Sequence, residues 1–324
     1  MLTSLANCGR NLFVLSPGAR AAAVAAAAKI LARTVLIVLC GSLLLLGGCS
    51  ALRVGYNQAD WLAYRWIAAY ADFDDAQATR VRNAIAEWFL WNRRTQLPDY
   101  ADLLLRIDAE VHADTNAQRV CGWWSEVRTR LDRGVERVVP AIAEIAATLT
   151  PAQLESIERR YAKTNFAYRD DFLQPDPAVR AGEALKRVVN RAESAYGDLD
   201  AFQRERIDRW MADSPFDPRL TDDERKRRQQ DALQTLRQLA GQLPAPAAST
   251  DAAAARALIR GWVARVDRSP REPHRAYSAS VVQYNCRLAA NIHNSTSPAQ
   301  RRAASQKLRA WAADLRALAA EAAG

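Results

Sequence analysis

The sequence predicts an all-α protein built as a multi-helix bundle. Alanine, the residue that most favours a helix, occurs 64 times in 324 residues, whereas glycine and proline together occur only 26 times. Apolar residues recur at intervals of three and four along most of the chain, which is the period of a helix that buries one face. The sequence contains no clear run of alternating apolar and polar residues bounded by hairpin turns, so strands are not expected.

Residues 1–48 are expected to be a signal peptide that is removed from the mature protein. They contain four basic and no acidic residues, and they include an uncharged apolar run at 34–46. This run is shorter than the roughly 20 residues that span a bilayer, and it suits the hydrophobic region of an export signal. Without residues 1–48 the net charge falls from +9 to +5.

The apolar run ends in Leu46, Gly47, Gly48 and Cys49, which resembles the lipobox of bacterial lipoproteins. Leu46 and the two small glycines suit recognition by signal peptidase II, and the thiol of Cys49 is the predicted site of lipidation. Three acyl chains on Cys49 exceed the two anchoring signals that stable membrane attachment requires. Ser50 stands where an aspartate favours inner-membrane retention, so we expect outer-membrane sorting. The alternative is an uncleaved signal anchor that happens to contain a cysteine.

The mature chain is expected to be a lipidated tether followed by two helical halves. The predicted segments are the tether at 49–56, an N-terminal half at 57–173, a connecting helical hairpin at 174–212 and a C-terminal half at 213–324. A linker with two prolines is expected at 243–250.

Helix starts are marked by capping boxes, in which Asp, Ser or Thr is followed three residues later by Gln or Glu. The predicted starts are Asp74, Thr150, Asp200, Thr221 and Ser297. The predicted ends lie beside Pro98, Pro175, Pro215 and Pro270. Starts 76 residues apart in each half, Asp74 to Thr150 and Thr221 to Ser297, indicate a faint internal duplication. Chance similarity among helices with common caps is the alternative.

The clearest apolar stripe lies in the N-terminal half. Val127, Leu131, Val135, Val138, Ile142, Ile145 and Leu149 follow one another at intervals of three or four. This spacing places all of them on one face of a helix, so we expect that face to lie in the core.

Two cysteines, Cys121 and Cys286, remain after the signal peptide leaves and Cys49 is acylated. An oxidising periplasm would favour a disulfide between them, which would join the two halves of the mature chain. Two buried, unpaired thiols are the alternative.

The sequence contains no recognisable catalytic or metal-binding motif, and no cofactor is predicted. His112, His274 and His293 do not have the helical spacing of zinc ligands, and phosphate-binding glycine loops and Gly-x-Ser-x-Gly are missing. Acidic groups such as Asp222-Asp223-Glu224 are expected in first helical turns, where they complement the helix dipole.

Basic residues cluster at 93–94, 226–228 and 301–302. We expect these clusters to be solvated helix faces, with attraction to anionic phospholipid or cell-wall groups as the alternative. Nucleic acid is not an expected partner of an exported protein.

Nine tryptophans are present, and two of them, Trp123 and Trp124, are adjacent. Adjacent residues point about 100° apart on a helix, so both cannot face one narrow core. Burial between helix layers is one interpretation, and partner binding by Trp123 or Trp124 in an exposed groove is the other.

Two stretches of the mature chain carry distinctive motifs. The first is Tyr56-Asn57-Gln58-Ala59-Asp60-Trp61-Leu62, and the second runs from Trp88 through Trp91-Asn92-Arg93-Arg94-Thr95-Gln96-Leu97-Pro98-Asp99-Tyr100-Ala101. In these stretches the chain resembles an uncharacterised family of proteobacterial all-helical lipoproteins, over most of residues 49–324. The resemblance implies an outer-membrane lipoprotein with a domain of unknown function. It also implies a histidine at Asn92 in many relatives, which weighs against a catalytic site there.

We therefore expect a non-enzymatic lipoprotein on the periplasmic face of the outer membrane, acting as a scaffold or chaperone-like binder in envelope assembly. Its expected partners are the membrane, through the lipid anchor, and envelope proteins or the cell wall. The alternative is an enzyme, or an enzyme-activating cofactor, of cell-wall remodelling. A deep pocket with paired carboxylates would favour the enzyme, and an apolar groove would favour the binder.

Overall fold

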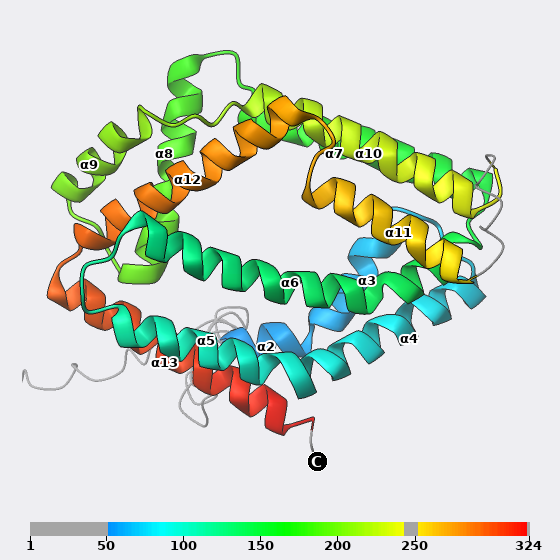
Figure 1. Ribbon diagram of the computed structural model, residues 1–324, viewed down its shortest axis with the longest axis horizontal. Coiled ribbons are helices and arrows are strands. Elements are labelled where there is room, and N and C mark those ends of the chain that lie inside the picture. The colour runs from blue at the N-terminus through cyan, green and yellow to red at the C-terminus, as the bar shows by residue number, and fades with distance from the viewer. Residues whose placement is uncertain (1–50, 243–251, 323–324) are drawn as a thin grey trace, which may run out of the picture. The chain divides into compact units, whose positions relative to one another are not determined.

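The computed structural model describes residues 51–242 and 252–322, and every regular element in these ranges is a helix (Figure 1). The predicted all-α class is therefore confirmed. In chain order the elements are α2 (Ala51–Asn57), α3 (Ala59–Ala68), α4 (Asp75–Trp91), the π-helix η1 (Asn92–Gln96), α5 (Leu97–Glu110), α6 (Ala117–Ala146), α7 (Pro151–Phe172), α8 (Pro177–Tyr196), α9 (Ala201–Met211), α10 (Pro218–Leu239), α11 (Ala252–Asp267), α12 (Glu272–Asn294) and α13 (Pro298–Ala320).

Several predictions fall outside these ranges. The signal peptide, the lipobox residues Leu46, Gly47, Gly48 and Cys49, the sorting residue Ser50 and the linker at 243–250 all lie outside the described residues. Residues 51–56 of the expected tether form most of helix α2.

Capping boxes begin four helices at the predicted residues. Asp74, Thr150, Asp200 and Ser297 each accept a hydrogen bond from the backbone N–H three residues later, and a glutamine there reaches back to the cap. The predicted start at Thr221 is wrong. Helix α10 begins at Pro218 with Asp217 as its N-cap, because a capping aspartate followed by proline already supplies a favourable start. The 76-residue spacing of helix starts therefore does not recur in the second half.

The predicted helix end beside Pro98 is also wrong. Helix α4 continues through the π-helix η1 into α5 without a loop, and the Leu97 N–H bonds to the Asn92 carbonyl five residues earlier. Pro98 stands in the first turn of α5, a position that helices tolerate because they do not need its missing N–H there. The predicted ends beside Pro175, Pro215 and Pro270 are confirmed, since each proline lies between two helices.

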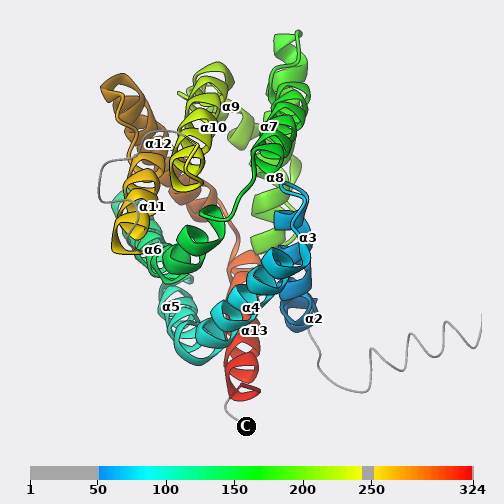
Figure 2. The same cartoon turned by 90° about the vertical axis from the view of Figure 1, so that its right-hand side faces the viewer.

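Helices from distant parts of the chain pack side by side in the unit that follows residue 50. Helix α13 lies along α5, both α11 and α12 pack on α6, and α10 packs on α7 (Figures 1 and 2). Helices of the expected C-terminal half thus pack mainly on helices of the expected N-terminal half. The duplication itself stays a prediction.

Buried apolar side chains in the described residues form separate small clusters rather than one central core. One joins α8, α9 and α12 around Ile207, and another joins α7 and α10 through Leu154 and Leu233. A third joins α6 to α11 through Val139 and Ile259. Leu131 and Val135, on the face of α6 that lies beside α4, belong to none of these clusters, and the candidate site lies there.

Candidate functional site

A cavity of about 850 Å³ lies between α3, α4 and α6. Its volume falls in the range of about 300–1,000 Å³ that is typical of small-molecule binding pockets. Among the described residues that line it there is no aspartate or glutamate, and the few polar groups are Tyr56, Tyr70, Asn92, Tyr100 and Arg130. The other lining residues have apolar side chains, apart from Trp88, which has an indole ring.

Three amphipathic helix faces form the walls, each with residues three or four apart. The lining residues are Ala59, Ala63 and Ile67 of α3; Val81, Ala84, Ile85, Trp88 and Phe89 of α4; and Leu131, Gly134, Val135, Val138, Ala141, Ile142 and Ile145 of α6. This periodicity turns one apolar stripe of each helix toward the same space.

The middle of the predicted apolar stripe, from Leu131 to Ile145, lines the cavity on the α6 side. Its members Leu131 and Val135 are 54% and 38% exposed, although the spacing predicts a core face. They are exposed because the space in front of them is hollow rather than filled by another helix. The interpretation of this stripe as close-packed core is therefore wrong at these two positions.

Trp88 holds the α4 and α6 walls together. Its indole Nε1–H donates a hydrogen bond of 2.9 Å to the Gly134 carbonyl of α6. A Cβ on Gly134 would lie 3.4 Å from the Trp88 ring, so the ring packs at van der Waals distance from the α6 backbone here. The bond satisfies the one polar atom of Trp88 and leaves its ring as apolar wall.

The polar groups at one edge of the cavity satisfy one another. The Tyr56 hydroxyl donates to Asn92 Oδ1 at 2.6 Å, and Asn92 Nδ2 donates to the Tyr100 hydroxyl at 3.4 Å. Burial raises the pKa of Tyr56 to about 12, despite the opposing charge of Arg93, so its hydroxyl stays protonated. Asn92 is buried and begins the π-helix, a local irregularity that is frequent at functional sites.

The two distinctive sequence stretches meet at this edge. Arg93 donates to Asn57 Oδ1 at 2.7 Å and lies 4.9 Å above the Tyr56 ring, while Tyr56 makes an edge-to-face contact with Phe89. The sequence did not identify Tyr56, Asn92 or Tyr100 as site residues. Their place inside the two distinctive stretches was the signal that could have found them.

Arg130 of α6 brings a positive charge to the cavity lining. One terminal nitrogen of its guanidinium donates to Asp99 Oδ1 at 2.8 Å, and the other donates to the Glu126 backbone carbonyl at 2.9 Å. Its Nε–H is buried and has no hydrogen-bond partner among the described residues. The guanidinium charge is paired with the Asp99 carboxylate at 2.8 Å and with the Glu126 carboxylate at 3.4 Å.

The predicted partner-binding residues Trp123 and Trp124 do not line this cavity. They lie near the N-terminal end of α6, where Trp124 is exposed and Trp123 is partly buried beneath the Arg119 guanidinium, 5.8 Å from its ring. A role for them in partner binding stays a prediction.

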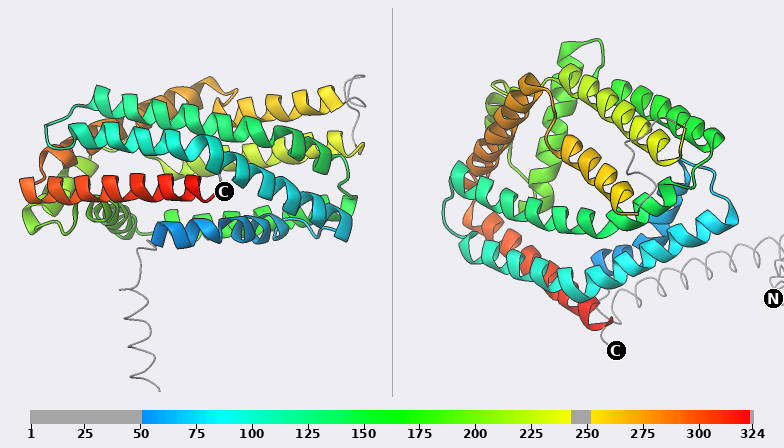
Figure 3. Two further views of the ribbon diagram at one scale, coloured as in Figure 1. Left: turned by 90° about the horizontal axis from the view of Figure 1, so that it is seen from below. Right: turned by 45° about the vertical axis from the view of Figure 1, so that its right-hand side comes forward.

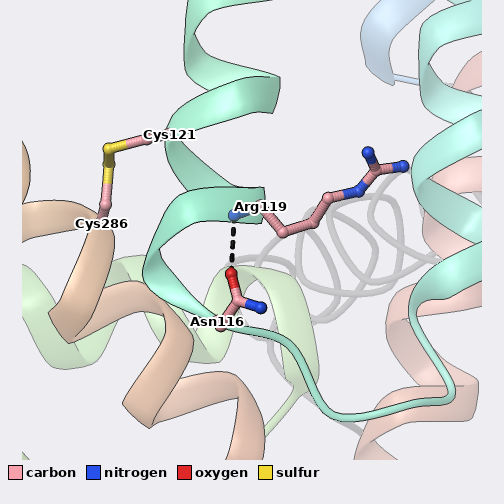
Figure 4. Close-up of a disulfide and its surroundings, with 4 residues drawn as sticks. All are labelled: Asn116, Arg119, Cys121 and Cys286. Carbon is pink, nitrogen blue, oxygen red and sulfur yellow. Dashed lines mark hydrogen bonds between the residues drawn. A yellow bond between two sulfur atoms is a disulfide. The ribbon is translucent and has the colours of Figure 1, made fainter.

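Cys121 and Cys286 form a disulfide between α6 and α12, with their Cα atoms 5.5 Å apart (Figure 4). The bond lies close to the start of α6, where the Asn116 side chain caps the helix by accepting the Arg119 N–H at 2.9 Å. Of the two alternatives for these cysteines, the structure contains the pair. Helix α6, which carries one wall of the cavity, is thereby held to α12.

The buried carboxylate of Glu224 lies outside the cavity and is neutralised by arginines. Glu224 accepts hydrogen bonds from Arg227, Arg228 and Arg271. Burial alone would raise the pKa of Glu224, but the bonds from Arg227 and Arg271 outweigh it and lower that pKa to about 2. The expected place of Glu224 in a first helical turn is wrong, because α10 begins at Pro218 and Glu224 lies beyond its first turn in a buried ion-pair network.

Each basic cluster contains ion pairs within the chain. Lys226 pairs with Asp222 at 2.6 Å, Arg301 with Asp114 at 2.5 Å, and Arg93 with Glu321 at 3.5 Å. At least one basic residue of each cluster is therefore paired with an acidic residue of the same chain.

His293 is buried between two hydrogen bonds that fix its ring. The Tyr196 hydroxyl lies 2.9 Å from Nδ1, and Nε2 lies 2.8 Å from the Ala113 carbonyl. Because a carbonyl can only accept, Nε2 carries the proton and Nδ1 accepts from Tyr196. Burial lowers the pKa of His293, so the ring is neutral in this arrangement.

The fold is that of an all-helical protein with an apolar cavity between amphipathic helices. The chain belongs to a family of unknown function, DUF6279, whose model matches residues 69–243, more than half of the chain. The expected membership of an uncharacterised family is thus confirmed. The matched range includes α4 and α6, two of the three walls of the cavity.

No curated protein and no solved structure matches the chain. Among the described helices, none has both the length and the apolar character required to span a bilayer.

Proposed function

We propose that this protein is a non-enzymatic lipoprotein of the outer membrane that faces the periplasm and acts as a chaperone-like binder in envelope assembly. The part of its client that it holds is a hydrocarbon chain of an acylated envelope component. The observation that carries the proposal is the apolar cavity of about 850 Å³ between α3, α4 and α6.

The chemistry of the lining favours a hydrocarbon chain over an extended peptide. A peptide that enters a dry site must satisfy its backbone N–H and C=O groups, or each costs roughly 1–3 kcal/mol. The walls are helices whose backbone groups are already paired, and Tyr56, Asn92 and Trp88 are engaged with protein atoms. A hydrocarbon chain needs no such partners and gains about 0.8 kcal/mol for each buried methylene.

Arg130 supplies the group that would recognise the head of such a ligand. Its guanidinium is ion-paired with Asp99 and Glu126, and an anionic head group would bind it by displacing one of these carboxylates. Arg130 is the one charged side chain among the described lining residues, so we expect the head group of an anionic amphiphile, such as a fatty acid, to lie beside it.

The cellular address follows from the sequence alone. The signal-like segment at 1–48, the lipobox ending at Cys49 and the following Ser50 support export, lipidation and sorting to the outer membrane. An acyl-chain binder at that address would meet lipids and acylated proteins as its natural ligands.

The alternative of a cell-wall enzyme or enzyme activator has less support. No carboxylate is among the described residues that line the cavity, and the buried Glu224 is already saturated by arginines. A glycan-cleaving site would need two carboxyl groups about 5–9 Å apart in a cleft.

The proposal is tested by fatty-acid binding to the body from residue 51 onward, purified without detergent. A fluorescent long-chain fatty acid should bind saturably, and palmitate should displace it. Shortening the competitor should weaken displacement about fourfold per methylene, the equivalent of about 0.8 kcal/mol.

Two substitutions at the exposed part of the α6 wall make this test specific. Val135→Trp fills the space and Leu131→Asp places a charge in it, and each should weaken palmitate binding at least about tenfold. Leu220→Asp is the matched control, because Leu220 is similarly exposed but lies on α10 outside the cavity. Unchanged binding in both cavity variants, or no saturable binding by the unaltered body, would overturn the proposal.

The proposed role of Arg130 in binding the head group is tested by comparing a charged ligand with an uncharged one. Arg130→Gln should weaken palmitate binding while leaving the binding of hexadecanol, which has the same chain but no charge, nearly unchanged. Equal effects on both ligands would limit Arg130 to a structural role.

A further inference from the structure

Helix α3 has an exposed apolar face in addition to the face that lines the cavity. Trp61, Leu62 and Trp66, together called the α3 patch, are 52%, 52% and 63% exposed. Large aromatic side chains bury 150–250 Å² each when they find a partner, so two half-exposed tryptophans five residues apart on one helix are an unusual surface.

Helical geometry separates the patch from the cavity wall. At about 100° per residue, the three patch residues lie within an arc of about 140°. The cavity residues Ala59, Ala63 and Ile67 lie on the adjoining side of the same helix. Figure 3 shows α2 and α3 in line with each other at one edge of the helical body, in the left panel. The patch therefore belongs to the outside of the body rather than to an unfilled core.

The composition of this face is that of a helix at a membrane surface. Tryptophan is amphipathic and is enriched where bilayer meets water, because its ring is apolar and its N–H is polar. The exposed Arg65 lies in the same arc, with its guanidinium 4.8 Å from the Trp61 ring. An arginine beside such rings can keep its charge at the level of lipid phosphates while its stem lies against apolar surface.

The position of α3 in the chain indicates what covers the patch. The predicted lipid attachment site, Cys49, precedes Ala51 by two residues, which span at most about 7 Å. Helix α2 adds seven residues, or about 10 Å, before α3 begins. Val54 of α2 is also exposed. Nine further residues lead from Asn57 to Trp66, so an acyl anchor at Cys49 would hold the patch within about 30 Å of a bilayer, at a high effective concentration.

We propose that the α3 patch rests on the phospholipid bilayer, with Trp61, Leu62 and Trp66 in the interfacial region and Arg65 at the level of the phosphates. This inference requires the predicted anchor at Cys49 and does not depend on the cavity. If both the membrane contact of the α3 patch and acyl-chain binding by the cavity are correct, α3 lies between the cavity and the membrane that supplies the acyl chain.

The test uses the full acylated chain reconstituted into vesicles of phosphatidylethanolamine and phosphatidylglycerol, with or without bromine on the acyl chains. Bromine quenches tryptophan fluorescence at short range, so tryptophans in the interface lose emission. Trp61→Phe combined with Trp66→Phe keeps an apolar patch but removes the reporters, and it should abolish at least about half of the bromine-dependent loss. Trp124→Phe combined with Trp311→Phe is the matched control, since these tryptophans are also exposed but lie on α6 and α13.

The outcomes separate the patch from the anchor and from the cavity. Loss of the bromine effect in the α3 variant, with the effect retained in the control, supports the proposal. An equal bromine effect in both variants overturns it, and so does the absence of any effect in the unaltered protein, which would favour a protein partner at this face. The mass of the N-terminal peptide reports acylation of Cys49. A peptide without acyl mass also overturns the proposal, whereas fatty-acid binding by the cavity would be unaffected.

Discussion

Gln77 and Gln153 lie in the first turns of α4 and α7, and their side-chain amides hydrogen bond to each other in both directions. Gln77 Nε2 donates to Gln153 Oε1 at 3.2 Å, and Gln153 Nε2 donates to Gln77 Oε1 at 2.6 Å. Each glutamine is also the third helical residue of a capping box. Its side chain therefore accepts a hydrogen bond from the backbone N–H of its own N-cap residue and also binds the glutamine of the other helix. Gln203 and Gln300 make the same reciprocal pair between the starts of α9 and α13.

We expect Gln153→Ala to lower the free energy of unfolding by about 2 kcal/mol, because it leaves buried groups without partners. The Asp72 carbonyl would lose its bond from Gln153 Nε2, 2.6 Å long, and the Gln77 amide would lose its partner. Denaturant unfolding of the body from residue 51 measures the change. Gln234→Ala is the control, because Gln234 is exposed on α10 and should change stability by less than about 0.5 kcal/mol.

The pairing can be tested beyond the single substitution. Gln77→Ala combined with Gln153→Ala should cost less than the sum of the two single changes, with a coupling of about 0.5–3 kcal/mol. Strict additivity would contradict a direct interaction between the two side chains.

Capping boxes illustrate how far the sequence alone could reach. Asp74, Thr150, Asp200 and Ser297 were predictable as helix starts because a capping box is a local pattern. The glutamine pairs were not predictable, because they depend on which helix ends meet in space. Thr221 fits the same pattern, but Asp217 and Pro218 lie earlier and take its place as the helix start.

The candidate site was less predictable than the fold. The apolar stripe of α6 was visible in the sequence, but its period cannot distinguish a face packed against another helix from a face that lines a hollow. Tyr56 and Asn92 are 36 residues apart and meet only through the path of α2 to α4. Trp123 and Trp124 were predicted as binding residues because of their residue type. The cavity wall on α6 begins about two turns further along the helix.

Glu224→Gln should lower the free energy of unfolding by about 3 kcal/mol or more, because three arginines lose a buried carboxylate. Glu158→Gln removes an exposed carboxylate that pairs with Arg237 at 3.2 Å, and it should cost less than about 1 kcal/mol. Denaturant unfolding at neutral pH compares the two. Equal costs would mean that burial does not strengthen the Glu224 network.

The low pKa of Glu224 gives a second observable. Its pKa falls from 4.5 to about 2 on folding, so its contribution to stability is fully present above about pH 4.5. The contribution is lost as the pH falls from 4.5 toward 2. Unaltered protein should therefore lose stability more steeply than Glu224→Gln across this interval.

His293 should make stability depend on pH nearer neutrality. The unfolded chain binds a proton at a pKa of about 6.5, whereas burial lowers the pKa of folded His293 below this value. Its contribution is therefore present above about pH 6.5 and is lost as the pH falls toward the folded pKa. His293→Gln should flatten the melting temperature between pH 7 and 5.

Reduction of the Cys121–Cys286 bond should lower the free energy of unfolding by about 2–4 kcal/mol. The bond joins residues 165 positions apart, so it removes a large amount of freedom from the unfolded chain. Unfolding with and without dithiothreitol measures the effect. Cys121→Ser combined with Cys286→Ser should be insensitive to the reductant. Two thiols that react with a labelling reagent after denaturation of the unreduced protein would contradict the bond.

The most direct test of the acyl-chain site is a crystal structure of the body from residue 51 with palmitate that carries bromine at the end of its chain. We expect an anomalous bromine peak inside the cavity between α3, α4 and α6, with the carboxylate beside the Arg130 guanidinium. A crystal saturated with the fatty acid that shows no bromine in this cavity, or bromine only on the outer surface, would contradict the proposed function.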